Sequence, residues 1–349
     1  MREYIRTRIR AQVLEVVHGG DMHLERYTGP PGDPGVLGPG SVAWRVHAEP
    51  AGMLPGGFAA LMLQSLHPLA MAGVDEHSDF RTDPIGRLNR TARYVTTTTF
   101  GSTREAEASF AKVRRIHTYV HGTASDGRPS RADDPDLLTW VHTAESWCFL
   151  AGYQAYAAER LSPADCDRYF AEVAVLAERL GAADPPRSAA EIEAYLDRVR
   201  PELHATPAAL AALGFLRGFG RSAQERLATK ILMNGGISLL PDWAREQLGV
   251  HRPALVRAGL DRPAARLVGG LLMWACGPSE IAAAARARAA GQGPGHVLEH
   301  GQVPTQAAAP ADAGDSPPIP LQQPPGGKTA DVAADADVRR RPPGRTRTP

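Results

Sequence analysis

Apolar residues recur at helical spacing along most of the chain. Between residues 42 and 72 the chain is strongly apolar, and its run FAALMLQSLHPLAMAGV has the length and composition of a buried helix. Pro68 lies inside this run, so the helix must kink or break there. Helical patterns are also predicted over residues 1–17, 102–120, 136–156, 222–248 and 253–275, and further helices begin at Ser162, Ser188 and Thr206.

Local signals support these helices at several of their starts. Ser102 followed by Glu105 fits a capping box, and Ser162-Pro163 is a polar cap followed by proline at the first turn. The segment 91–99 is rich in β-branched residues, but it has too few apolar residues for a sheet strand and no partner nearby. We therefore predict helix there, and a loop over 122–135.

Two segments lack the composition of a packed domain. Residues 18–41 are rich in glycine and proline, and beyond about residue 290 large apolar side chains almost vanish, so little surface is left to offset the entropy of ordering. The sequence predicts an all-α fold with one helical domain over 37–285. An N-terminal helix and Gly/Pro-rich loop (1–36) precede it, and a disordered Pro/Ala/Gly-rich tail (286–349) follows it.

Composition narrows the class of protein. The 39 basic and 38 acidic side chains are balanced, which argues against a nucleic-acid binder. Three widely spaced cysteines form no CxxC pair, so reduced thiols and a cytoplasmic location are expected. No apolar run has the roughly 20 residues of a transmembrane helix, and the N-terminus lacks the apolar core of a signal peptide. A peripheral contact with a membrane remains open.

Candidate chemistry is concentrated between residues 64 and 149, inside the predicted helices. Histidine and arginine are costly to bury without partners, by several kcal/mol. Arg87, Arg90 and Arg93 share one helix face and require anionic partners. Those partners are either nearby acids and water, or an acidic cofactor such as haem through its propionates. The polar residues of this segment are His67, Glu76, His77, Arg87, Arg90, Thr91, His117, His121 and His142.

A single imidazole from an apolar helix is enough to ligate haem iron. His117 is the best placed, because it shares a helix face with Phe110 and Val113. His121 is one turn later and is the alternative ligand. His142 is a third candidate, as ligand, distal residue or packing residue. Histidines outside this segment, His47 among them, are interpreted as ordinary packing or surface residues.

Several short motifs, in order, carry a resemblance to a known family. The runs QSLHPLA and GVDEHSDF (64–70 and 73–80) resemble the QxxHPxxAxGVxxHSxF signature of the MpaB oxygenase family, which is related to the latex-clearing rubber oxygenases. Further similar elements are GSVAWRV from Gly40, DPIGRLNRT from Asp83, FGS from Phe100, RIHTYVHG from Arg115 and DPDLLTWVH from Asp134.

The resemblance implies an all-α fold with a haem pocket, haem b held by one proximal histidine, and dioxygen chemistry. The proximal histidine maps best onto His117. An arginine, a lysine and a threonine lie beside the haem in the rubber oxygenases, and Arg87, Arg90 and Thr91 match them here. Arginine does not deprotonate, so Arg90 is a poor replacement for a lysine that can bind the iron. The catalytic glutamate is best matched by Glu76, and Asp75 is the competing acid.

We therefore predict a haem b-dependent oxygenase that acts with O2 on a small apolar substrate, such as an alkenyl or isoprenoid compound. Arg87, Thr91 and Glu76 would be catalytic, with Glu76 as a base. The haem would be bound by His117 with Arg87, Arg90 and His142. Two alternatives remain: a haem-binding sensor or storage protein without catalysis, and a non-haem helical protein with a structural polar core. The electron donor is not indicated.

Overall fold

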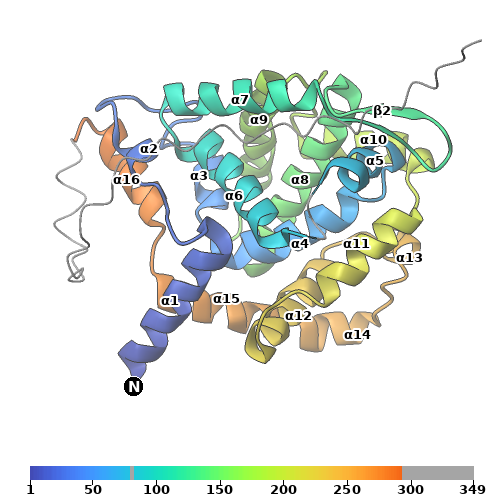
Figure 1. Cartoon of the computed structure of the whole chain (residues 1–349). Helices are drawn as coiled ribbons and strands as arrows, with labels where there is room; N and C mark the ends of the chain where they lie inside the picture. The colour runs from blue at the N-terminus through green and yellow to red at the C-terminus, as the bar shows by residue number, and fades with distance from the viewer. Residues whose placement is uncertain (79–81, 293–349) are drawn as a thin grey trace, which may run out of the picture. The chain divides into compact units, whose positions relative to one another are not determined.

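The computed structural model describes residues 1–78 and 82–292, and within these ranges the chain is almost entirely helical (Figure 1). The all-α prediction is confirmed. Asp79 and Phe80 of the HSDF run, and the tail from residue 293, lie outside the described residues. The helices are α1 (Arg2–His18), α2 (Glu25–Thr28), α3 (Val42–His47), α4 (Pro50–Gln64), α5 (Pro68–His77), α6 (Pro84–Phe100), α7 (Thr103–His117), α8 (Pro135–Tyr156), α9 (Pro163–Leu180), α10 (Ala189–Val199), η2 (Arg200–Glu202), α11 (Pro207–Arg217), α12 (Ala223–Ile237), α13 (Asp242–Gln247), α14 (Ala254–Val256), η3 (Arg257–Asp261), α15 (Arg262–Cys276) and α16 (Glu280–Ala289).

Five helices begin with a polar cap followed by proline, and α4 is one of them, with the Glu49 side chain accepting from the backbone N–H of Ala51. Asp83, Asp134, Ser162 and Thr206 precede α6, α8, α9 and α11, and each side chain accepts a hydrogen bond from a backbone N–H of the first turn. Proline suits the position after the cap, because that N–H has no helical partner to lose. These signals fix the starts of the helices that carry most of the candidate residues.

The apolar run 42–72 breaks before Pro68, as the sequence predicts. α4 and α5 meet there at an angle of 103°, and His67 lies buried at the corner against Trp140 of α8, with 5.9 Å between ring centroids. No single helix in the described part of the chain is long and apolar enough to cross a membrane. Two bent pairs reach that length and composition only when the two members of each pair are counted together. They are α4 with α5, and residues 254–276 with α16.

The predictions for residues 122–135 and 222–248 were wrong in part. β1 (His121–Thr123) and β2 (Pro129–Arg131) form an antiparallel hairpin in which Gly122 pairs with Ser130. Strands of three residues are too short to show an alternating pattern. The second segment is two helices, α12 and α13, because Pro241 precedes the second and cannot continue the first.

The C-terminal end of the helical region also differs from expectation. The segment 253–275 comprises α14, the π-helical η3 and α15, and α16 follows and continues past residue 285. Arg288 of α16 is fully buried and donates hydrogen bonds to the backbone oxygens of Asp33, Tyr27 and Phe100. α16 is made mostly of alanine, so its sequence lacks the large apolar side chains that would reveal its packing.

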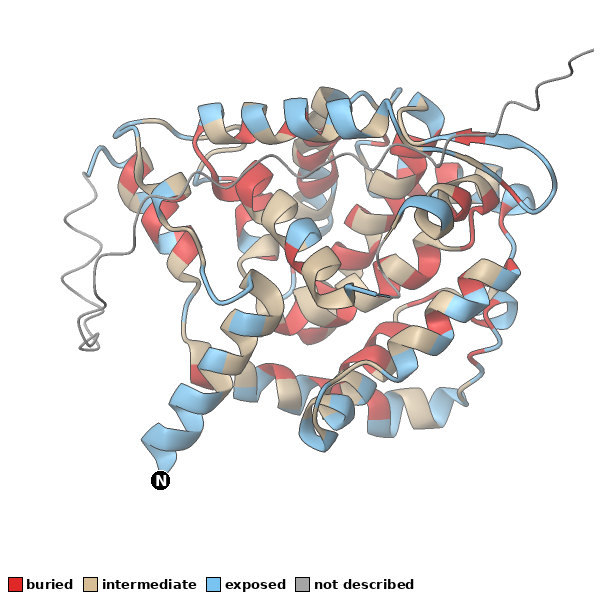
Figure 2. Cartoon of the chain, in the orientation of Figure 1, coloured by how far each residue is buried: buried red, intermediate tan, exposed pale blue. Residues whose placement is uncertain are grey.

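The core is built on close contact between α4 and α8, which pack on each other more extensively than any other pair of described elements. Figure 2 shows the buried residues concentrated on these inner helices. Glycines permit the approach: a Cβ on Gly152 of α8 would lie 2.3 Å from the backbone oxygen of Gly52 on α4, and one on Gly56 would lie 2.8 Å from the Cys148 oxygen. The rigid crossing fixes where α8 presents its polar side chains.

Candidate functional site

Two titratable side chains of α8 lie one helical turn apart on its inner surface. His142 has its Nε2 atom buried without a hydrogen-bond partner in the described part of the chain, and desolvation lowers its pKa to about 4. Desolvation also raises the pKa of Glu145 to about 7. A spacing of three residues places both on the same helix face. The His142 imidazole is therefore neutral at neutral pH. The Glu145 carboxyl gains or loses its proton close to neutral pH.

His47 of α3 adds a second imidazole to this region. Its Nδ1 lies 2.8 Å from the hydroxyl of Thr99 and its Nε2 lies 3.1 Å from that of Tyr169, so both nitrogens have partners. Desolvation, and to a lesser extent the charge of His142, lowers the pKa of His47 to about 3. Desolvation thus keeps the His47 ring neutral, and its hydrogen bonds to α6 and α9 hold it in one orientation. The ring lies near His142.

Glu145 lies near one tyrosine of α6 and one of α9. Desolvation first, and then the carboxylate of Glu145, raise the pKa of Tyr94 on α6 and of Tyr169 on α9. His47, Tyr94, His142, Glu145 and Tyr169 are called the interior polar cluster below. Sequence reasoning found only His142 of these five, although a glutamate inside LLTWVHTAESWCFL, three residues after a histidine, was a usable signal.

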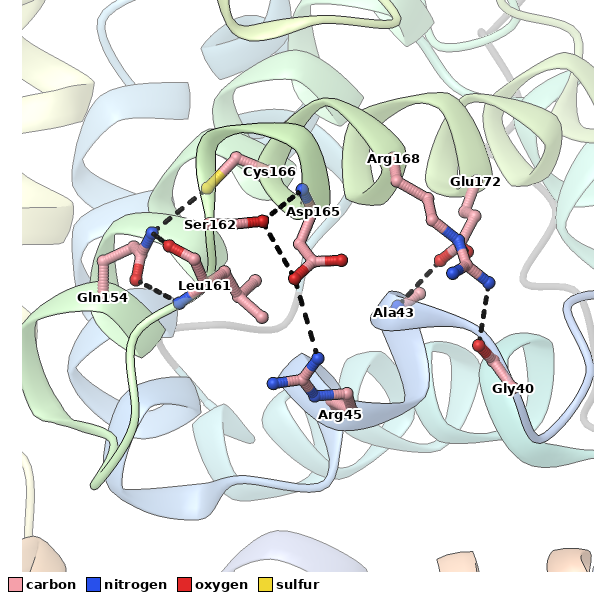
Figure 3. A network of polar contacts seen from close by, with 10 residues as sticks. All are labelled: Gly40, Ala43, Arg45, Gln154, Leu161, Ser162, Asp165, Cys166, Arg168 and Glu172. Atoms are coloured by element: carbon pink, nitrogen blue, oxygen red, sulfur yellow. Dashed lines mark hydrogen bonds and ion pairs between the residues drawn. The ribbon is translucent and has the colours of Figure 1, made fainter.

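The position of α3, which carries His47, is fixed by hydrogen bonds to α9 (Figure 3). The Glu172 carboxylate accepts from the backbone N–H of Ala43 at 2.9 Å, and Arg168 donates to the Gly40 oxygen at 2.9 Å. A longer ion pair of 3.9 Å joins Arg45 to Asp165. These contacts fasten the start of α3 to α9, so His47 meets Tyr169 without depending on a mobile loop.

His117, the predicted iron ligand, lies at the last residue of α7. Its Nδ1 is buried without a hydrogen-bond partner among the described residues. Desolvation lowers the pKa of the imidazole, and the nearby charge of Asp133 opposes that shift without cancelling it. Earlier on α7, Phe110 is buried against Tyr94 of the interior polar cluster, with ring centroids 6.2 Å apart. The apolar face of α7 that carries His117 therefore packs on α6.

The three predicted residues of α6 differ in their surroundings. Arg87 is partly buried, its guanidinium donates to the Ser78 hydroxyl, and desolvation followed by the charge of Arg90 lowers its pKa. Arg90 is exposed and forms an ion pair of 3.3 Å with Asp83. Thr91 is exposed and donates to the backbone oxygen of Arg87 at 3.2 Å. Of the three, only Arg87 has the burial expected of a residue that binds an internal anion.

Glu76, His77 and His121 lie together where α5 meets the hairpin. Glu76 is exposed and accepts a hydrogen bond of 2.9 Å from the backbone N–H of Thr123. The His77 ring bonds the backbone oxygen of His121, whose own side chain is exposed. These contacts anchor β1. A base needs burial to raise its pKa, and Glu145 has that burial whereas Glu76 does not. Because the His121 side chain is exposed, it is a weaker candidate ligand than His117.

The donor set restricts the kind of metal centre. Within residues 1–78 and 82–292, no group of three or more His, Cys, Asp or Glu side chains is arranged to hold a metal ion. A centre held wholly by side chains in this part of the chain is therefore not indicated. Haem iron needs only one imidazole, because the porphyrin supplies the other nitrogens. His67, His117 and His142 each have a buried ring nitrogen without a hydrogen-bond partner among the described residues, and each fits that requirement. His67 lies at the corner between α4 and α5 against Trp140, so the family resemblance favours His117 among the three.

Comparison with known protein families shows to which family the chain belongs. A family model described as the ER-bound oxygenase mpaB/B'/Rubber oxygenase catalytic domain matches residues 44–270. The chain belongs to this oxygenase family. The match includes every predicted site residue, and it confirms the resemblance seen in the short motifs. No curated protein and no solved structure matches the chain significantly.

Replacing Glu145 by glutamine should change how the stability of this oxygenase depends on pH. Burial raises its pKa from 4.5 to about 7, so the folded state holds this proton more tightly than the unfolded state. The contribution of this proton to the free energy of unfolding is therefore complete below about pH 4.5, and it is lost as the pH rises through about 7. From about pH 5 to about pH 8 the wild-type protein should lose about 3 kcal/mol through this group.

Urea unfolding of the wild type and of Glu145→Gln over this range measures the effect. The buried histidines act in the opposite sense, since the lowered pKa values of His47 and His142 cost stability as the pH falls below 6.5. Their contribution is common to both proteins and cancels in the difference. A difference that stays constant with pH would show that Glu145 is not held protonated.

Proposed function

We propose that this chain is a haem b-dependent oxygenase that uses O2 to oxidise a small apolar substrate, such as an alkenyl or isoprenoid compound. The family supports oxygenase activity. The observation that carries the haem assignment is the buried Nδ1 of His117, which has no partner among the described residues. Leaving such an atom unsatisfied costs about 1–3 kcal/mol, and coordination through the ring would give the imidazole a role that explains its burial.

The protonation state of His117 suits ligation. Only a neutral imidazole can bind a metal, and desolvation lowers the pKa of this ring, so the neutral form is favoured at neutral pH. His142 has the same property and a buried free Nε2. We assign His117 as the ligand, and His142 as a second imidazole that would contact the bound haem. When bound, haem b would supply the iron that activates dioxygen.

Arg87 would bind a haem carboxylate. A guanidinium has five N–H donors, and Ser78 takes one of them, which leaves donors that can accommodate a carboxylate in a bidentate arrangement. Arg87 is also partly desolvated, so a buried anion beside it would be stabilised more than one at the surface. Arg90 already bonds Asp83 at the surface, which makes it the weaker candidate.

Arg87→Ala should retain the fold but lose haem more readily, while Arg90→Ala serves as the matched control on the same helix. Loss of a charge-assisted hydrogen bond of about 1.5–3 kcal/mol corresponds to roughly ten- to a hundredfold weaker retention. Haem transfer to excess apomyoglobin measures the rate of loss. Equal rates for both variants would refute the role of Arg87 at the carboxylate.

Glu145 fits the role of proton acceptor better than Glu76. A base for an allylic C–H needs a pKa near the working pH, and burial gives Glu145 a pKa of about 7, whereas Glu76 is exposed and bonded to the hairpin. Glu145→Gln and Glu76→Gln are compared in an assay of ¹⁸O transfer from ¹⁸O2 into squalene, an isoprenoid alkene. A larger loss with Glu76→Gln would return the role to Glu76. Haem binding without labelled product would favour a sensor or storage protein.

A further inference from the structure

Large apolar side chains are exposed mainly on two neighbouring parts of the molecule, α1 and the segment α14–α15. On the second, Leu255, Leu260, Leu267 and Leu271 are 87%, 60%, 76% and 45% exposed. Leu260, Leu267 and Leu271 are seven and four residues apart, so they form one stripe along the helix. The opposite face of α15 is buried in the core, and a Cβ on Gly269 would lie 2.8 Å from that of Ala51.

The first turns of α1 extend this apolar surface. Tyr4 and Ile5 are 67% and 44% exposed. α1 packs on the C-terminal end of α15, where the Arg2 guanidinium lies 5.6 Å from the ring centroid of Trp274 and Arg6 donates to the Ala275 oxygen at 3.4 Å. Figure 1 shows α1 meeting α15, with α14 at the other end of α15. We call the exposed residues of α1 and α14–α15 together the basal surface.

The basal surface is basic, although the whole chain has a net charge of only +1. Its exposed side chains include five arginines (Arg2, Arg6, Arg8, Arg262 and Arg266) and two carboxylates (Glu3 and Glu15). The less exposed Arg10 and Arg257 form ion pairs with Glu280 and Asp242, and Asp261, 3% exposed, is paired with Arg252 at 2.5 Å. Beside α15, a surface pocket of about 260 Å³ is lined by Arg160, Arg262 and Arg266 and by no acidic side chain.

We propose that the basal surface docks on an anionic lipid bilayer. Its leucines enter the boundary between headgroups and acyl chains, and its arginines meet the lipid phosphates. Amphipathic helices that lie on membranes combine an exposed apolar stripe with basic flanks in this way. A second copy of the chain is a poorer occupant, because a two-fold interface would bring the same arginines against each other.

Co-sedimentation of the full chain with vesicles tests the proposal. The protein should bind mixed phosphatidylcholine–phosphatidylglycerol vesicles and should bind pure phosphatidylcholine at least tenfold more weakly. The double variant Leu267→Asp, Leu271→Asp should lose about tenfold or more in binding to the mixed vesicles. Arg8→Glu changes the charge of an exposed side chain of α1 by two units. Binding to the mixed vesicles should weaken about fivefold for each unit.

Leu210→Asp is the matched control, because Leu210 is 46% exposed on α11, outside the basal surface, and it should bind as the wild type does. Circular dichroism confirms that each variant is folded. Unchanged binding of the double leucine variant would overturn the proposal. A dimer in light scattering that the leucine variant abolishes, without vesicle binding by the wild type, would assign the surface to a second copy instead.

Discussion

His117→Ala is expected to yield a folded protein without a Soret band. The imidazole lies at the end of α7, partly buried and with its Nδ1 unpartnered among the described residues, so its removal takes away the only iron ligand that we assign. Truncating a partly buried side chain at a helix end should cost little stability, about 1–2 kcal/mol. Haem content by the pyridine haemochrome assay should fall to background, while helix content by circular dichroism stays unchanged.

His121→Ala is the matched control, because this histidine is close in sequence but exposed on β1. It should retain full haem content. Retention of haem by His117→Ala together with its loss in His142→Ala would move the ligand to α8, beside Glu145. Loss in His121→Ala alone would move it to the hairpin.

Gly152→Ala is expected to cause the largest loss of stability among small substitutions. The new Cβ would lie 2.3 Å from the backbone oxygen of Gly52 and 3.2 Å from the Cα of Gly56, and backbone atoms of a packed helix cannot yield cheaply. Overpacking of this kind costs about 3 kcal/mol or more. For a chain of this size that lowers the midpoint of thermal unfolding by roughly 10 °C, which differential scanning fluorimetry detects.

Gly57→Ala on α4 provides the opposite expectation. No atom lies within 4 Å of its Cβ position, and alanine favours a helix interior over glycine by about 0.5–1 kcal/mol. This variant should unfold at the wild-type temperature or slightly above it. Equal destabilisation by both substitutions would contradict the close α4–α8 contact.

Much of the fold follows from local signals in the sequence. The polar caps followed by proline predict where α9 and α11 begin, and Pro68 predicts the break between α4 and α5. The hairpin and α16 escaped prediction for a physical reason. Strands of three residues show no alternation, and an alanine-rich helix shows no apolar stripe, so only tertiary contacts such as those of Arg288 reveal them.

The candidate site was predicted less completely than the fold. The short motifs identified the family and located His117, Arg87 and His142, since motif order is a property of the sequence. Burial depends on the tertiary fold and cannot be read from motif order. It is burial that favours Arg87 over Arg90 as the anion-binding residue, and Glu145 over Glu76 as the base. His47 could not be singled out, because its partners Thr99 and Tyr169 are 52 and 122 residues away along the chain.

The absorption spectrum of the purified wild-type protein, expressed with added haem precursor, tests the central proposal most directly. A Soret band that follows the protein through gel filtration, with about one haem per chain by the pyridine haemochrome assay, is the expected result. Protein that is folded by circular dichroism but shows no Soret band, even after reconstitution with haemin, would contradict haem dependence. It would leave the histidines and arginines as partners in a structural polar core.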